Sequence, residues 1–94
     1  MAANGARGEV VAVLAGQERR LCLTLGALAE LETAFAAEGW EDLAARLRGL
    51  SARDLTTVLA ALLRGGGEDP GDLTAVALGE AARAVASAFT AAGA

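Results

Sequence analysis

The hydrophobic period of the chain changes within residues 21–35, and this change constrains the fold more than any other feature. Up to Leu25, leucines occupy every second position, which is the pattern of a half-buried strand. Beyond Leu25 the apolar residues are Leu28, Leu31 and Phe35. Spacings of three and four define one face of a helix, and the hydroxyl of Thr24 can cap its first turn. A strand that runs almost directly into a helix predicts strands before this point and helices after it.

An antiparallel β-hairpin is predicted for residues 8–25. Its first strand, residues 8–14, is rich in β-branched residues, and Gly16 can take the positive φ that a tight turn needs. The second strand is expected to return over residues 19–24. The inward side chains are expected to be Leu21, Leu23 and Leu25 on the second strand and Val11 and Val13 on the first. Because side chains alternate along a strand, a one-residue slip would instead turn inward Val10, Ala12 and Leu14.

The rest of the chain, residues 25–92, is predicted to be helical. The first helix is expected over residues 25–37 and the second over 41–48. A third begins at Ser51, whose hydroxyl can cap it, and ends at the glycines of residues 65–67. Residues 73–78 have a helical pattern, and a last amphipathic helix is expected from Glu80 onward.

The chain has 94 residues, which predicts a single domain over 1–94. Residues 1–7 are expected to be a flexible tail, 8–25 the hairpin and 25–92 the helical part. The predicted fold class is therefore α+β, a two-stranded antiparallel hairpin packed on four to five short α-helices. The core is expected to contain Val11, Val13, Leu21, Leu23, Leu28, Leu31, Phe35, Leu43, Leu47, Leu55, Leu59, Leu62, Val85 and Phe89.

Groups that commonly carry catalysis are scarce. The chain has no His, no Tyr and one Cys, and Cys22 is expected on the outward face of its strand with no imidazole to activate it. The acidic turn around Glu68, Asp69 and Asp72 lacks the alternation of a calcium loop, so a solvated turn is favoured over a cation site. We therefore expect no catalytic residue, no metal and no cofactor, and the chain is not expected to be an enzyme.

Charge and hydropathy narrow the possible partners. The net charge is −4 and the arginines are scattered, which argues against binding to nucleic acid, since phosphate contacts need a concentrated basic face. The apolar runs are shorter than the ~20 residues of a membrane span. We expect a cytoplasmic protein without a membrane partner.

The order of several short segments resembles one protein family. The segments are Gly8-Glu-Val10, Gly16 at the turn, Leu21-Cys-Leu-Thr-Leu25, Ala27-Leu-Ala-Glu-Leu-Glu32, Leu50-Ser-Ala-Arg-Asp-Leu55 and Leu59-Ala-Ala-Leu-Leu-Arg-Gly65. In this order they resemble the small tail assembly chaperones of gene transfer agents and tailed phages, encoded in head–tail gene clusters of α-proteobacteria. The resemblance implies a non-enzymatic protein that binds the tape measure protein during tail assembly. It also implies tail tube subunits as further partners.

Two other functions compete with the chaperone. The first is a structural tail or connector component that stays in the finished particle. The second is a small transcriptional regulator, but the segment from Leu55 to Leu63 is too apolar to face phosphate.

A partner-binding groove is predicted from apolar residues that do not share one helical stripe. They are Leu63, Leu73, Val76, Leu78 and Phe89. The glycines of residues 65–67 are expected to act as a hinge that lets the flanking segments separate. The groove is expected to accept a partner helix, or to mediate homo-oligomerisation when no partner is present. The alternative is that the same residues complete the core.

Overall fold

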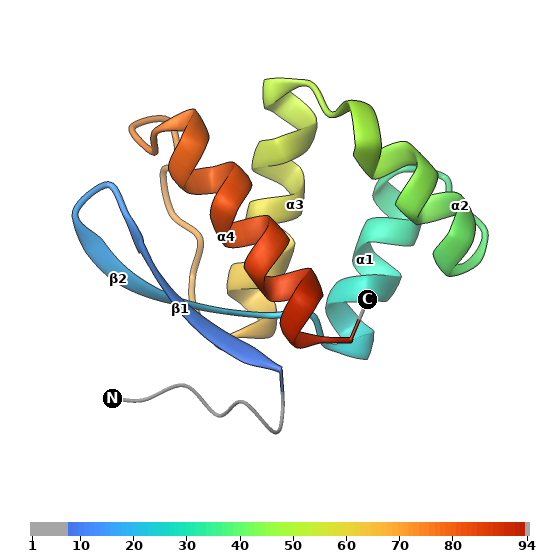
Figure 1. The fold of residues 1–94 in the computed structure, drawn as a ribbon, viewed down its shortest axis with the longest axis horizontal. Helices are drawn as coiled ribbons and strands as arrows, with labels where there is room; N and C mark the ends of the chain where they lie inside the picture. Colours follow the sequence, from blue (N-terminus) through green and yellow to red (C-terminus); the bar gives the residue numbers. More distant parts are fainter. Residues whose placement is uncertain (1–7, 94) are drawn as a thin grey trace.

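The computed structural model describes residues 8–93 and confirms the predicted α+β class within them. The hairpin consists of β1 (Glu9–Leu14) and β2 (Gln17–Cys22). The helices are α1 (Leu25–Ala34), α2 (Gly39–Arg46), the 3₁₀ helix η2 (Leu47–Gly49), α3 (Ala52–Gly65) and α4 (Leu78–Ala91) (Figure 1). The flexible tail expected at residues 1–7 lies outside the described residues.

The hairpin turn is two residues long and sets the register of the strands. Ala15 and Gly16 both have positive φ, 52° and 80°, which a two-residue turn of this kind requires. The antiparallel register therefore closes with Leu14 opposite Gln17 and continues with Val10 opposite Leu21. Residues 10, 12 and 14 consequently share a face of the hairpin with Leu21.

This register corrects the expected inner face of the first strand. Val11 is 40% exposed and Val13 54% exposed, whereas Leu14 is 2% exposed and Val10 and Ala12 pack against the core. Leu21 faces the core and pairs with Val10, so the inward set of β1 is the slipped alternative. The four-residue turn expected from the sequence would give the same face, because it moves each pairing by two residues. Leu25, expected to face inward, is 85% exposed, because β2 ends at Cys22 and Leu25 opens α1.

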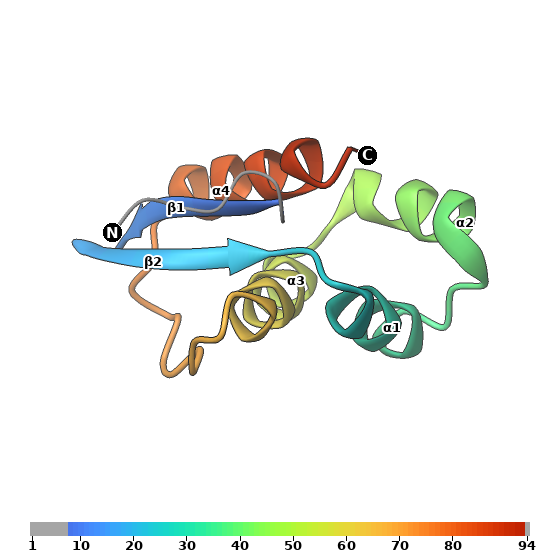
Figure 2. The ribbon, with the colours of Figure 1, turned by 90° about the horizontal axis from the view of Figure 1, so that it is seen from below.

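The hairpin lies against two helices that follow it much later in the chain. Figure 2 shows α4 along β1 and α3 along β2, with α2 at the far end of the molecule. The β1–α4 pair is antiparallel: the backbone N–H of Ala15 donates to the Glu80 carboxylate at 3.2 Å. At the other end, a β-carbon on Gly8 would lie 3.3 Å from the carbonyl oxygen of Ala91.

The outer edge of β2 is covered by the end of α3. A β-carbon on Gly65 would overlap the carbonyl oxygen of Cys22, and one on Gly66 would overlap that of Arg20. The Glu68 carboxylate accepts hydrogen bonds from the Arg19 side chain and, at 2.8 Å, from the backbone N–H of Arg20. The expected hinge is thus a close contact between backbones. It also buries Cys22, which was expected to face outward.

The core is formed by the inner face of the hairpin, α1, α3 and α4. Leu21, Leu31, Leu43, Leu55, Leu59, Leu62 and Val85 are buried as predicted, and Leu23, Leu28, Phe35, Leu47 and Phe89 pack partly buried against them. The sequence prediction omitted the small buried residues of α4, Ala81, Ala84 and Ala88. Their short side chains allow β1 to lie close to this helix.

Residues 73–78, expected to be helical, form part of an irregular connection, and α4 begins only at Leu78. The reason is a local turn at Asp72, whose carboxylate accepts from the backbone N–H of Thr74 at 2.9 Å and from its hydroxyl at 2.7 Å. Such side-chain turns compete with helix formation. Gly71, with φ of 63°, bends the chain just before it.

Candidate partner-binding site

The largest apolar depression described lies between α2 and α4, and we call it the α2–α4 groove. Its volume is about 590 Å³. One side comes from α2, η2 and the residue after it, the other from α4, and Leu55 of α3 contributes to the lining. The lining residues are Ala44, Leu47, Arg48, Leu50, Leu55, Leu78, Ala82, Val85, Ala86 and Phe89. The groove exists because α2 packs on α1 and η2, so that α4 is left without a helix on this side.

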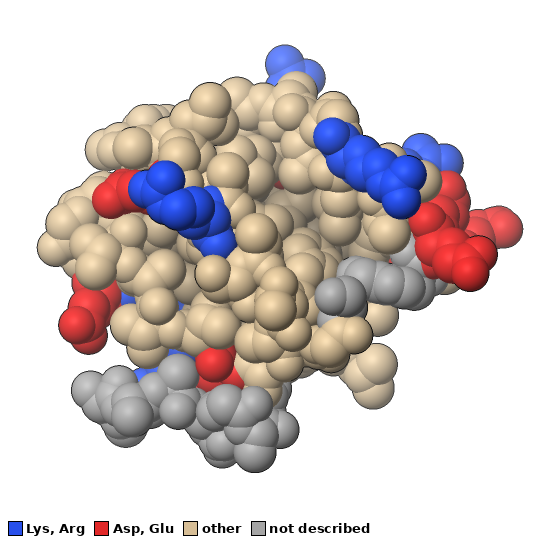
Figure 3. Space-filling model, viewed as in Figure 1, with Lys and Arg blue, Asp and Glu red and all other residues tan. Residues whose placement is uncertain are grey.

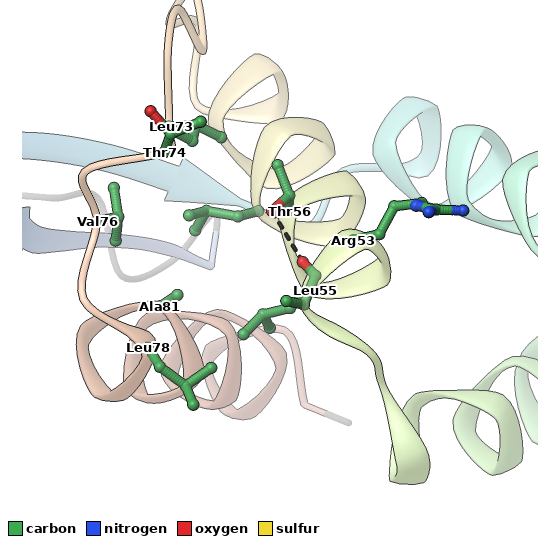
Figure 4. A pocket seen from close by; sticks show the side chains of 10 residues that line it. Arg53, Leu55, Thr56, Leu73, Thr74, Val76, Leu78 and Ala81 are labelled. Atoms are coloured by element: carbon green, nitrogen blue, oxygen red, sulfur yellow. Dashed lines mark hydrogen bonds between the residues drawn. The ribbon is translucent and has the colours of Figure 1, made fainter.

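A second depression of about 330 Å³ adjoins the groove, and we call it the loop pocket. It lies between α3, the connection before α4 and the start of α4. Figure 4 shows Leu73, Val76 and Leu78 approaching Leu55 from the connection and α4, while the Arg53 side chain extends away from them. Leu55 and Leu78 line both depressions, so the two form one continuous apolar surface.

The structure brings together most of the residues predicted to bind a partner. Leu73 and Val76 line the loop pocket, Phe89 lines the α2–α4 groove, and Leu78 lines both. Leu78 is 69% exposed. Leu63 has no exposed surface and lines neither depression, because it packs inside the core beneath α3.

The sequence prediction missed the α2 side of the groove. Leu47 was assigned to the core, Ala44 to the apolar stripe of the second helix, and neither these residues nor Leu50 to the groove. A usable signal was present in α4, where Ala82 and Ala86 stand one turn apart and leave space beside the helix. The facing segment, from Leu47 to Leu50, carries the matching apolar side chains.

Arg48 lines the groove and Arg53 the loop pocket, and no carboxylate of the described residues lines either depression. Arg83, the one basic residue of α4, lines a separate depression beside β1, together with Val13 and Glu80. Figure 3 shows basic and acidic side chains close together over α4 and at the α2 end of the molecule, with a largely uncharged face between them.

The other arginines include several that are engaged in ion pairs. Arg19 pairs with Glu68, Arg46 with Asp42 and Arg64 with Glu30. The hydrogen bond from Arg64 and its charge lower the pKa of Glu30. Within residues 8–93, Arg48, Arg53 and Arg83 form no ion pair. The arginines around the two depressions are therefore free to meet an external anion.

The described residues hold neither a metal-binding cluster nor a membrane-spanning helix. No group of three or more His, Cys, Asp or Glu side chains is arranged to hold a metal ion in residues 8–93. In the same residues, no helix has the length and apolar character that crossing a bilayer requires.

Comparison with known proteins gives one match, to a family model. Residues 7–94 match the model described as "Phage tail tube protein, GTA-gp10", where GTA stands for gene transfer agent. No curated protein and no solved structure matches the chain significantly. The expected relationship to gene-transfer-agent and phage tail proteins is confirmed, although the description names a tube protein and not a chaperone. Because the match covers nearly the whole sequence, the chain belongs to the phage tail tube protein, GTA-gp10, family.

Proposed function

We propose that this chain is a structural component of the tail of a phage-like particle or gene transfer agent. The observation that carries the proposal is the family match over residues 7–94. A tail subunit works through surfaces that bind other proteins, and it needs no catalytic group. The continuous apolar surface of the α2–α4 groove and the loop pocket supports such a role, since large exposed apolar patches are typical of interaction sites.

Mass spectrometry of purified particles tests this proposal. A structural component should be present in mature tails at a fixed ratio to the other tail proteins, and it should stay after washing in high salt. Its absence from mature particles, in cells where the same gene is required for tail formation, would contradict a structural role.

A second candidate is an assembly chaperone that binds the tape measure protein and leaves before the tail matures. One specific observation favours it: the α2–α4 groove is open, apolar and lined by helices, the setting for binding an amphipathic helix. If the chain is a chaperone, we also expect the same surface to mediate self-association when no partner is present.

Co-expression tests the chaperone. The tape measure protein is produced with the wild-type chain, with a Leu78→Glu variant and without either, and its soluble fraction is measured. The chaperone predicts a gain in solubility that Leu78→Glu abolishes. Equal solubility in all three cultures would contradict it.

A further inference from the structure

We infer that the α2–α4 groove accepts an amphipathic α-helix of another tail protein whose apolar stripe is flanked by aspartates or glutamates. The inference takes one element from the proposed function, namely that the partner is a tail protein. The nature of the helix is argued from the groove itself.

The size and shape of the groove fit a helix of about three turns. On α4 the lining residues run from Leu78 to Phe89, which corresponds to about 16 Å at 1.5 Å per residue. The α2 side presents Leu47 and Leu50, three residues apart, opposite this row. A helix lying between the two sides would bury side chains at positions i, i+3, i+4 and i+7.

The charges around the groove select the partner. The chain carries 12 acidic residues and a net charge of −4, yet no carboxylate of the described residues lines the groove or the loop pocket. Arg48 lines the groove and Arg53 the loop pocket, and neither forms an ion pair in the described residues. Arginines at the rim of an interface steer and select partners of opposite charge. A helix with carboxylates on both flanks of its apolar stripe would meet them.

A second copy of this chain is a poorer occupant. Two copies that met groove to groove would bring Arg48 of one near Arg48 of the other. Like charges opposed across an interface are unfavourable. The arginines therefore favour a different, acidic partner over a symmetric dimer.

Two designed peptides test the inference on the full chain. Both are 18-residue helices with the same leucine stripe, flanked by Glu in one and by Lys in the other. Fluorescence anisotropy measures their Kd at about 0.1 M salt. Short helices are only partly formed in water, but this cost is similar for the two peptides and cancels in the ratio. We expect the Glu peptide to bind roughly fivefold more tightly, as two exposed ion pairs allow, and the ratio to shrink in 1 M salt.

Variants then locate the effect. Arg48→Glu should reduce the preference for the Glu peptide by roughly threefold, because this arginine lines the groove. The matched control changes the net charge equally on the exposed face of α1, with Ala29→Glu and Thr33→Glu, and should leave the ratio unchanged. Leu78→Glu should weaken both peptides, since this side chain lines the groove and is largely exposed.

Three results would overturn the inference. They are equal affinity for the two peptides, a preference that the α1 control removes as strongly as Arg48→Glu does, and a homodimer in sedimentation that competes with the Glu peptide. The particle analysis is independent of these measurements. A chain found in mature tails that shows no peptide preference refutes only the groove inference, and a clear preference in a chain absent from tails refutes only the structural role.

Discussion

Gly65 is the last residue of α3 and one of two glycines that touch the backbone of β2. In most helices an alanine is more favourable than a glycine by about 0.5–1 kcal/mol. Here the added methyl group would overlap the carbonyl oxygen of Cys22, so the backbones would have to separate.

Gly65→Ala should therefore destabilise the protein by about 1–3 kcal/mol, the usual cost of overpacking, in chemical denaturation. Gly26→Ala in α1 is the control, because its β-carbon would meet Thr24 at an ordinary 3.7 Å. The control should be neutral or stabilise by up to about 1 kcal/mol. Equal stability of the two variants would show that α3 does not lie this close to β2.

Glu68 joins the connection after α3 to β2 through Arg19 and Arg20. Its burial opposes ionisation, but the hydrogen bonds from Arg19 and Arg20 and their charges outweigh this and lower the pKa of Glu68 below its ordinary value of 4.5. A carboxyl whose pKa is lower in the folded state stabilises that state above the unfolded pKa. The stabilisation is lost as pH falls from 4.5 through the folded pKa.

Wild type should accordingly be more stable than Glu68→Gln at pH 7, and the difference should shrink below pH 4.5. Urea denaturation across this range measures it. Arg19→Gln removes one hydrogen-bond partner of the Glu68 carboxylate. In that background, Glu68→Gln should lower the stability at pH 7 by less than it does in wild type. Parallel stability curves for wild type and Glu68→Gln at every pH would contradict the prediction.

At the scale of elements, α1 is anchored by Leu31, which has no exposed surface. Leu31→Ala should lower the free energy of unfolding by about 2–5 kcal/mol, because the deletion leaves a cavity. Leu25→Ala in the same helix is the control and should change it by less than about 0.5 kcal/mol, since that side chain is exposed. A loss below 1 kcal/mol for Leu31→Ala would mean that the α1 contact is not part of the core.

Local signals were sufficient to predict most elements. The caps at Thr24 and Ser51 act as expected: Thr24 accepts from the Ala27 N–H at 3.0 Å and Ser51 from the Asp54 N–H at 3.1 Å. The face of β1 was wrong because residues 10–14 are all apolar, so the hydrophobic pattern does not distinguish one face of this strand from the other. The helix at residues 73–78 was wrong because the turn at Asp72 competes with its hydrophobic pattern.

At the scale of the whole molecule, Leu63 and Leu78 show the difference between the core and the apolar surface of the two depressions. Leu63→Glu would bury an unpaired charge and should unfold the protein, with a loss of at least about 4 kcal/mol. Leu78→Glu should stay folded, because this residue is 69% exposed at the first turn of α4. Circular dichroism melting curves distinguish the two, and a folded Leu63→Glu variant would contradict its place in the core.

The site could be predicted only in part, for a reason that lies in tertiary packing. Leu73, Val76 and Leu78 were assigned to a groove because they do not share one helical stripe, and Phe89 was placed in both the groove and the core. All four line the two depressions. The position of α2 relative to α4 depends on contacts between distant segments, which periodicity does not report. Leu63 was misplaced for the same reason: α3 is buried around more of its circumference than one helical stripe.

The pairing of β1 with α4 also has a consequence for how the chain is made. Ala15 and its partner Glu80 are 65 residues apart, so a ribosome adding about 5–20 residues per second needs roughly 3–13 s to reach the second from the first. A hairpin forms in about 1–10 μs. During synthesis, the inner face of β1 therefore stays without its covering helix for roughly a million times as long as a hairpin takes to form. In every nascent chain Leu14 is therefore exposed until α4 has been translated. Only then can the folded chain bind another protein.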